Sequence, residues 1–258
     1  MPLQNRVTPW GSLEAVAVRY SVDTVAFGNR GPLHNDQQRV IKPWHSKAWL
    51  ACRYHVTRTR KVQRDDNRAF NGRKRVVMRP GFYTELFFLD QLTATAAGHR
   101  PCACCRRADF ASFRLAWMRA HGGEWSAGSI DDVLHRERQA SRGTASQPPR
   151  SPTLSSMRET LTAMPDGTFV SLSGRDADTR DAWLCWRGQL LRWTHQGYRD
   201  RMPMSSIDGT REVILLTPHS MVAAMRCGFV PGEVHESAHA LIDAVPGAST
   251  DDKAVEKC

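Results

Sequence analysis

Short apolar runs separated by turn residues dominate the first part of the chain. Residues 13–27 (LEAVAVRYSVDTVAF) predict one or two short strands, and the Gly, Asn and Pro residues within 28–36 predict a loop. Residues 49–57 (WLACRYHVT) are rich in β-branched and aromatic side chains and predict a further strand. Residues 75–78 (RVVM) are interpreted as the returning strand of a β-ribbon. We therefore expect short strands in this part of the chain.

Helical spacing follows the turn predicted at Pro80-Gly81. Residues 84–97 place apolar side chains close to one helical face, and Gly98 follows at a position where glycine commonly ends a helix. Aromatic side chains at i, i+3 and i+7 predict a second helix over about 107–121. A capping serine with an acidic residue three positions later predicts a third helix from Ser129.

The second half of the chain has a different pattern of polar and apolar residues. Residues 143–156 are rich in Ser, Pro and Thr and predict an interdomain linker. Apolar runs beyond it predict three short strand regions and a closing helix, at 164–172, 182–193, 212–218 and 219–229. Arg187-Gly188 is the predicted turn of a hairpin. Periodicity is lost after Pro231, so residues 231–258 are expected to form a mobile tail.

Together these elements predict an α+β protein of two domains. The first domain, residues 1–142, is expected to hold short strands and about three helices. The second, residues 157–230, is expected to be small and β-rich. A chain of 258 residues can bury a sizeable core, and the 41% apolar content with eight tryptophans is typical of globular proteins.

Composition also restricts the compartment and the use of the cysteines. No apolar run is long enough to span a membrane, and the N-terminus lacks the apolar segment of a secretory signal. We therefore expect a cytoplasmic protein with reduced thiols and no membrane partner. Seven cysteines at irregular spacing then indicate metal binding or chemistry rather than a disulfide framework.

The formal net charge of +10 is concentrated in the first part of the chain. Residues 1–150 carry 25 Lys and Arg against 12 Asp and Glu, whereas the remainder carries 11 against 14. Such clustering favours a phosphate-rich partner, although solubility alone is an alternative reason for positive charge. The basic stretch, Arg53 to Arg79, holds ten Lys and Arg and two Asp. Within it, Arg58, Arg60 and Lys61 are candidates for phosphate contacts, unless the stretch is only a solvated loop.

Three cysteines fall within four residues in the segment AAGHRPCACCRR. Cys102 and Cys105 have the C-x2-C spacing that lets two thiolates of one tight turn bind one zinc ion, at about 2.3 Å. We call residues 102–105 the knuckle. A redox pair and packing in the core are the alternatives to metal binding. Three arginines that the knuckle would hold in place are candidates for binding phosphate: Arg100, Arg106 and Arg107.

A structural zinc site needs four ligands, so two more must come from elsewhere in the chain. Cys52 and His55 have C-x2-H spacing and would complete a site of three thiolates and one imidazole. On a flat strand these two side chains point to opposite faces, so a turn or bulge between them would be needed. Rival donors are His34, His99 and His135 for the fourth position, and Cys104 in place of Cys105.

The segment FFLDQLTATAAGHRPCACCRR, residues 87–107, resembles part of a known family. It is similar to the second half of the zinc-binding N-terminal domain of bacterial Ada-type DNA repair proteins, where a Phe-rich helix leads into Arg-Pro-Cys-x-x-Cys-Arg. The matching positions are Phe87, Phe88, Ala97, Gly98, Arg100, Pro101, Cys102, Cys105 and Arg106.

The resemblance covers about a twelfth of the chain. It implies a zinc site of four cysteines in a small α/β domain that grips the DNA backbone, which favours DNA as the nucleic acid. In that family one zinc-bound cysteine of a first C-x3-C pair accepts a methyl group from a phosphotriester. Cys52 is the only candidate for that role here, and Val56 stands where the second cysteine of the pair would be.

Two further motifs point to enzymes. His235 to His239 matches H-E-x-x-H, in which two histidines of a helix bind zinc and Glu236 would be the general base of a metalloprotease. Asp131 and His135 lie one helical turn apart and would suit a nuclease, although helix capping is the simpler interpretation. The favoured function is a zinc-binding protein that binds nucleic acid, with no small-molecule cofactor evident; methyl transfer, nuclease and protease activities are the alternatives.

Overall fold

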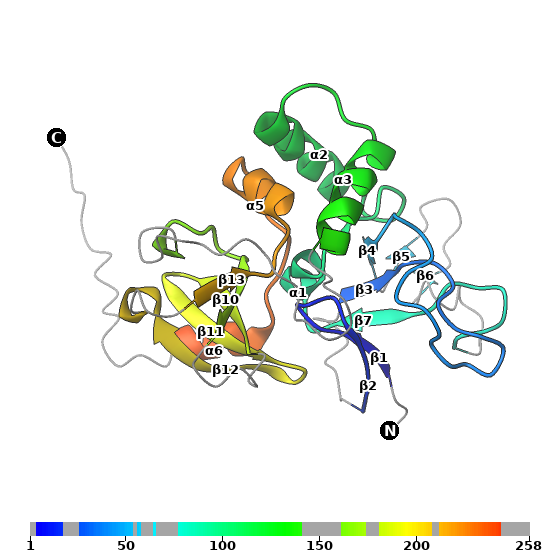
Figure 1. Cartoon of the computed structure of the whole chain (residues 1–258), viewed down its shortest axis with the longest axis horizontal. Helices are drawn as coiled ribbons and strands as arrows, with labels where there is room; N and C mark the ends of the chain where they lie inside the picture. Colours follow the sequence, from blue (N-terminus) through cyan, green and yellow to red (C-terminus); the bar gives the residue numbers. More distant parts are fainter. Residues whose placement is uncertain are drawn as a thin grey trace.

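A computed structural model describes residues 4–17, 26–53, 56–57, 64–65, 77–140, 161–173, 181–207 and 212–243 (Figure 1). These residues form an α+β fold with a six-stranded sheet, a five-stranded sheet and a two-stranded ribbon. Helix α1 lies between the two larger sheets, and α2, α3 and α5 gather beside it (Figure 1). The α+β class predicted from the sequence is therefore confirmed.

The first sheet is mixed, and it carries the candidate site at one edge. Its spatial order is β2 (Leu13–Val16), β1 (Gln4–Val7), β7 (Leu86–Phe88), β3 (Ala26–Asn29), β4 (Leu50–Cys52) and β8 (Arg100–Pro101). Two neighbouring pairs are parallel, β1 with β7 and β4 with β8, and the other three are antiparallel. The separate ribbon pairs β5 (Val56–Thr57) with β6 (Arg64–Asp65). Of the returning strand predicted at 75–78, residues 75 and 76 lie outside the described residues, and Val77 and Met78 form a turn.

Gly28, in the middle of β3, allows the strands of this sheet to approach closely. A Cβ atom at this position would collide with the backbone carbonyl of Leu50 and lie 2.9 Å from the Phe88 ring. We expect Gly28→Ala to lower the free energy of unfolding by about 1–3 kcal/mol, because neither neighbour can yield without shifting a strand. Urea denaturation measures the change. Gly128→Ala is the control, since only the Ser126 hydroxyl lies near that position and stability should hold or rise slightly.

The helix predicted over 84–97 is wrong in its first half. Residues Leu86–Phe88 form β7 in the interior of the sheet, and α1 spans only Gln91–Ala96. The Asp90 carboxylate begins the helix by accepting hydrogen bonds from the backbone N–H and the hydroxyl of Thr93, at 2.8 and 2.7 Å. Gly98 ends the segment at φ +81°, a conformation that favours glycine, as the sequence predicts.

Helices α2 (Arg107–His121), α3 (Ala127–Ala140) and α5 (His219–Arg226) form a helical cluster. Phe113 and Trp117 of α2 are fully buried in it, together with side chains of α3 and α5. The aromatic spacing predicted α2 correctly. Helix α3 begins two residues before the predicted Ser129, and the side chain of Ser126 accepts a hydrogen bond from the Ser129 N–H at 3.1 Å.

The second sheet is antiparallel throughout. Its order is β12 (Gly197–Pro203), β11 (Gln189–Thr194), β10 (Ala182–Trp186), β9 (Phe169–Ser173) and β13 (Glu212–Leu215), with a 3-10 helix at Met204–Ser206. Arg187 and Gly188 join β10 to β11 with φ of +48° and +72°. Two consecutive positive φ values are typical of a type I′ hairpin turn, which confirms the predicted hairpin.

The two sheets share a hydrophobic core through α1. The division into domains at 1–142 and 157–230 stays a prediction. Leu89, Leu92 and Ala96 pack in one cluster with apolar side chains of β9, β10 and β11. The Tyr198 hydroxyl of β12 donates a 2.7 Å hydrogen bond to Asp90 across the same boundary. The predicted linker, 143–156, lies outside the described residues.

Regular structure continues beyond Pro231, where the sequence predicted the start of a mobile tail (231–258). Helix α6 (Glu236–Asp243) packs against β12, with Ala238 fully buried in the core that the two sheets share. The local pattern is too short to predict this helix, because its apolar partners come from distant strands. Residues 244–258 lie outside the described part. Within the described part, no helix is long and apolar enough to cross a membrane.

Candidate metal centre

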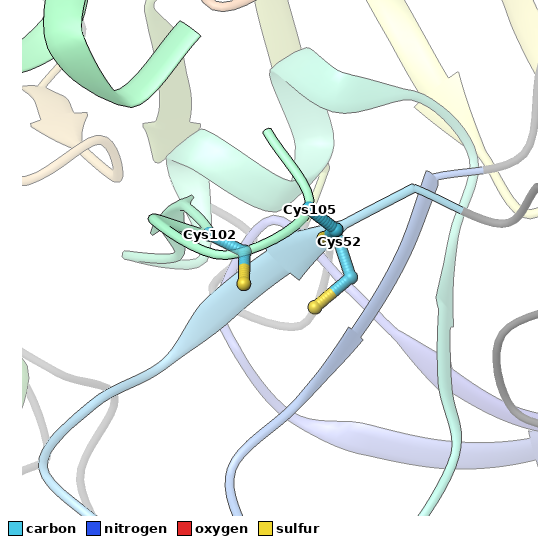
Figure 2. A group of neighbouring side chains, drawn as sticks. All are labelled: Cys52, Cys102 and Cys105. Atoms are coloured by element: carbon cyan, nitrogen blue, oxygen red, sulfur yellow. The ribbon is translucent and has the colours of Figure 1, made fainter. Parts of the chain in front are cut away.

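Three cysteine sulfurs meet where the knuckle adjoins the end of β4. The Sγ atoms of Cys52, Cys102 and Cys105 all lie within 4.8 Å of one another. Figure 2 shows Cys52 on the strand and the other two cysteines on the neighbouring loop. The structure thus brings together three of the four metal ligands predicted from the sequence; His55 lies outside the described residues.

The parallel pairing of β8 with β4 explains how residues fifty positions apart converge. Leu50 pairs with Arg100 and Ala51 with Pro101, so the next residue of each strand is a cysteine. The ladder continues as the Cys102 N–H donates to the Ala51 carbonyl at 2.9 Å. The chain then turns, and the Arg106 N–H donates to the Cys102 carbonyl at 2.9 Å, which returns Cys105 toward the strand.

An apolar wall surrounds the sulfurs. Cys52 and Cys102 are buried in one cluster with Phe27, and Leu50, Tyr83, Phe87 and Cys105 pack against it. The rings of Tyr83 and Phe87 stand edge-on to the Phe27 ring, at 6.3 and 5.8 Å. No local pattern predicts this wall, because its aromatic residues come from β3, β7 and the loop before β7 and meet only in the folded sheet. It keeps water from most of the site, which strengthens electrostatic interactions there.

The three thiols perturb one another's ionisation. The thiols of Cys105 and Cys52 donate hydrogen bonds to the Cys102 sulfur and lower the pKa of Cys102. The contacts with Cys102 and Cys105, followed by burial, raise the pKa of Cys52 well above its usual value. The contact with Cys102 also raises the pKa of Cys105. One thiolate is therefore easily formed, whereas three thiolates in one place require a compensating cation.

The donor set fits a thiophilic divalent metal. At a zinc–sulfur distance of 2.3 Å, tetrahedral thiolates are about 3.8 Å apart, so sulfurs within 4.8 Å need only small rotations to share one ion. No fourth His, Cys, Asp or Glu among the described residues belongs to this group. The predicted rivals are engaged elsewhere or exposed: His34 bonds to Thr84, His99 to Arg30, His135 packs edge-on against Trp44, and Cys104 faces solvent.

Two of the arginines predicted to bind phosphate are buried instead. Arg100 is 4% exposed and forms two 2.7 Å hydrogen bonds with the carboxylate of Asp131. Arg106 is also 4% exposed, and its Nε donates to Asp109 at 2.7 Å. Asp131 and Asp109, which lie further along the chain, neutralise these two arginines. Neither guanidinium is therefore available to a phosphate. Arg107 is exposed, whereas Arg58, Arg60 and Lys61 lie outside the described residues.

The enzyme motifs find little geometric support in the described part of the chain. Asp131 is engaged by Arg100, and the His135 ring packs against Trp44 at 4.5 Å, which leaves the predicted acid–base pair in structural roles. Helix α6 begins at Glu236, so His235 precedes the helix that should carry both histidines of an H-E-x-x-H site. The backbone N–H of His235 donates to Asp90, and the His235 ring bonds to Ser237.

Methyl transfer to Cys52, the reaction implied by the resemblance, requires access to its sulfur. The Cys52 residue is 3% exposed, and Cys105 is the most accessible of the three cysteines. An electrophile as large as a phosphotriester would have to displace the apolar wall to reach Cys52. The arrangement is therefore better suited to holding an ion than to presenting a nucleophile.

No protein-family model matches the chain, and neither a curated protein nor a solved structure matches it. The chemistry of the site must therefore be argued from its own residues. Those residues are three convergent sulfurs, an apolar wall and a basic stretch that begins immediately after Cys52.

Proposed function

We propose that this chain is a zinc-dependent nucleic-acid-binding protein. The observation that carries the proposal is the convergence of Cys52, Cys102 and Cys105 within 4.8 Å. Three thiolates in a mostly buried site favour zinc over the hard cations Mg²⁺ and Ca²⁺, which prefer oxygen ligands. His55, three residues after Cys52, is the proposed fourth ligand, and four protein ligands would make the zinc structural.

The proposed zinc ties the base of the basic stretch to the rest of the fold. Cys52 is the last residue of β4, and Arg53 begins the basic stretch. Cys105 lies two residues before α2 begins. An ion bound to both Cys52 and Cys105 would fix the end of β4, the knuckle and the start of α2 in one arrangement. It would also reduce the conformational entropy that is lost when a partner orders the basic stretch.

Charge supports nucleic acid as the partner. The basic stretch carries ten Lys and Arg against two Asp, and Arg39 and Arg107 are exposed in the described part of the chain. A polyanion with one charge per phosphate matches such a density, and neutralising it releases counterions. The resemblance to the Ada-type zinc domain favours DNA within this class.

Binding to a DNA duplex should weaken steeply with salt. If about three phosphates are neutralised, raising NaCl from about 50 to 200 mM should reduce affinity about 40-fold, since each phosphate contact adds about 0.9 to the logarithmic slope. A gel shift or anisotropy titration at both salt concentrations measures this. Repeating it after chelation of the metal should show weaker binding at the lower salt concentration, because the basic stretch loses its fixed base.

A pair of charge-reversal variants locates the contact. Replacing Arg58, Arg60 and Lys61 together by Glu should abolish the binding at the lower salt concentration. The matched control reverses three exposed arginines of the second sheet, Arg187, Arg199 and Arg201, and should retain most of the affinity. Equal losses in both triple variants, or no measurable binding of duplex or single-stranded nucleic acid by the unmodified protein, would refute the nucleic-acid part of the proposal.

A further inference from the structure

Two loops that adjoin neighbouring strands of the first sheet, one after β3 and one before β7, are hydrogen-bonded to each other. We call residues 33–42 and 77–84 the loop pair (Figure 1, the neighbouring blue and cyan loops on the right). The Gln38 side-chain amide donates to the Val77 carbonyl at 2.8 Å, and the Leu33 N–H donates to the Thr84 hydroxyl at 2.8 Å. These bonds join a segment that precedes the basic stretch in the sequence to one that overlaps its end, at residues 77–79.

The loop pair collects much of the exposed apolar surface of the described residues. Six large hydrophobic side chains are exposed in that part of the chain, and four of them belong to the loop pair: Val40, Ile41, Val77 and Phe82. Ile41 is 63% exposed and Phe82 39%. Isolated exposed apolar residues need no explanation, but this concentration on two joined loops is typical of a binding surface.

Positive charge is interleaved with these apolar side chains. Arg39 and Arg79 are exposed and Lys42 is partly exposed, whereas Asp36 is the only acidic residue within the loop pair. The guanidinium of Arg79 lies over the Phe82 ring, 5.1 Å from its centroid. A ring capped by a cation on one side is a surface that combines stacking with electrostatic attraction.

The framework under Phe82 is fixed. The Met78 N–H donates to the buried carboxylate of Glu85 at 3.0 Å, and the Phe82 N–H donates to the Arg79 carbonyl at 3.1 Å. Tyr83, the next residue, belongs to the apolar wall of the metal centre. A backbone held in this way reduces the conformational entropy that is lost when a ligand stacks on the ring.

We propose that the loop pair binds single-stranded nucleic acid, with an unpaired base stacked on Phe82 and its flanking phosphates near Arg39, Lys42 and Arg79. The inference rests on the proposed function and specifies its substrate class. Binding to a duplex backbone uses cationic and polar groups and offers no base for a ring to stack on, because the faces of paired bases are hidden within the stack. A cluster of apolar and cationic side chains instead matches a strand whose bases and phosphates are both accessible.

The test compares labelled homopolymers of about 20 nucleotides, oligothymidylate and oligouridylate, with a duplex of equal length by fluorescence anisotropy. The unmodified, metal-loaded protein should bind at least one of the single strands about tenfold more tightly than the duplex. Phe82→Ala should lose about tenfold of the single-strand affinity and leave duplex affinity unchanged, whereas Phe82→Tyr should retain it. Leu115→Ala, an exposed apolar residue of α2 outside the loop pair, is the matched control.

The outcomes separate the two proposals. Duplex binding that equals or exceeds single-strand binding overturns the loop-pair inference and leaves the proposed function standing. An unchanged single-strand affinity in Phe82→Ala has the same effect. Absence of binding to all three probes overturns both. If Phe82→Ala lowers single-strand and duplex affinity equally while its thermal unfolding is unchanged, stacking is again rejected. The two homopolymers decide between DNA and RNA as the source of the strand.

Discussion

Replacing Cys102 by Ser should remove the bound metal and destabilise the first sheet. We expect the purified protein to contain about one zinc per chain and Cys102→Ser to contain almost none, because serine is a poor ligand and the two remaining thiolates with the proposed His55 do not complete a site of four ligands. The midpoint of thermal unfolding should fall by about 10 °C or more, since each kcal/mol corresponds to about 2–4 °C in a chain of this size. Elemental analysis and a thermal melt measure the two effects.

Cys104→Ser is the matched control, because Cys104 belongs to the same loop but is exposed and lies outside the group of three sulfurs. It should retain the metal content and the melting midpoint of the parent. Chelation of the parent protein should reproduce the Cys102→Ser melt. A parent protein with no bound metal, or a Cys102→Ser variant that keeps it, would show that the three sulfurs are core packing only.

Removing the Asp131 carboxylate should cost about 3–5 kcal/mol of unfolding free energy. Asp131 forms the two 2.7 Å hydrogen bonds that neutralise Arg100, and both side chains are almost completely buried. Asp131→Ala would leave a guanidinium without its counter-charge in the core, next to the Phe110 ring. Urea denaturation measures the loss, and the variant should also bind metal less tightly, because Arg100 leads directly into the knuckle.

The neighbouring residue supplies the control for this ion pair. Asp132 bonds to Lys47 on the surface, with both side chains more than half exposed, so Asp132→Ala should unfold like the parent. Replacing both buried partners, in Arg100→Met with Asp131→Leu, should recover most of the stability, because no unpaired charge is left behind. If Asp131→Ala is as stable as Asp132→Ala, then the pair does not hold β8 to α3 as described.

Local signals in the sequence predicted the parts of the fold that depend on neighbouring residues. The aromatic spacing identified α2 from Arg107 to His121, and Arg187-Gly188 identified the hairpin, because periodicity and turn preferences are properties of short segments. The C-x2-C spacing identified two ligands. Cys52 followed as the only other cysteine in the basic half of the chain outside the knuckle segment, rather than from any knowledge of the β4–β8 pairing.

Failures occurred where distant residues decide the outcome. Leu86 to Phe88 have helical neighbours, yet they form a strand because β1 and β3 pair with them on either side. Arg100 resembles a phosphate ligand until Asp131, thirty-one residues later, is placed against it. The loop pair could not be predicted for the same reason, because its two loops are distant in the sequence. No local pattern marks Val40 or Phe82, and only the fold places their loops side by side.

Helix α1 belongs to the cores of both sheets, and this has a thermodynamic consequence. Unfolding of either sheet would expose one side of this short helix to water, since Leu92 packs toward the second sheet and Ala94 toward the first. The two halves should then unfold cooperatively, in one transition rather than two. Metal bound to Cys52, Cys102 and Cys105 would consequently slow the unfolding of the second sheet, although no strand of that sheet contacts the metal.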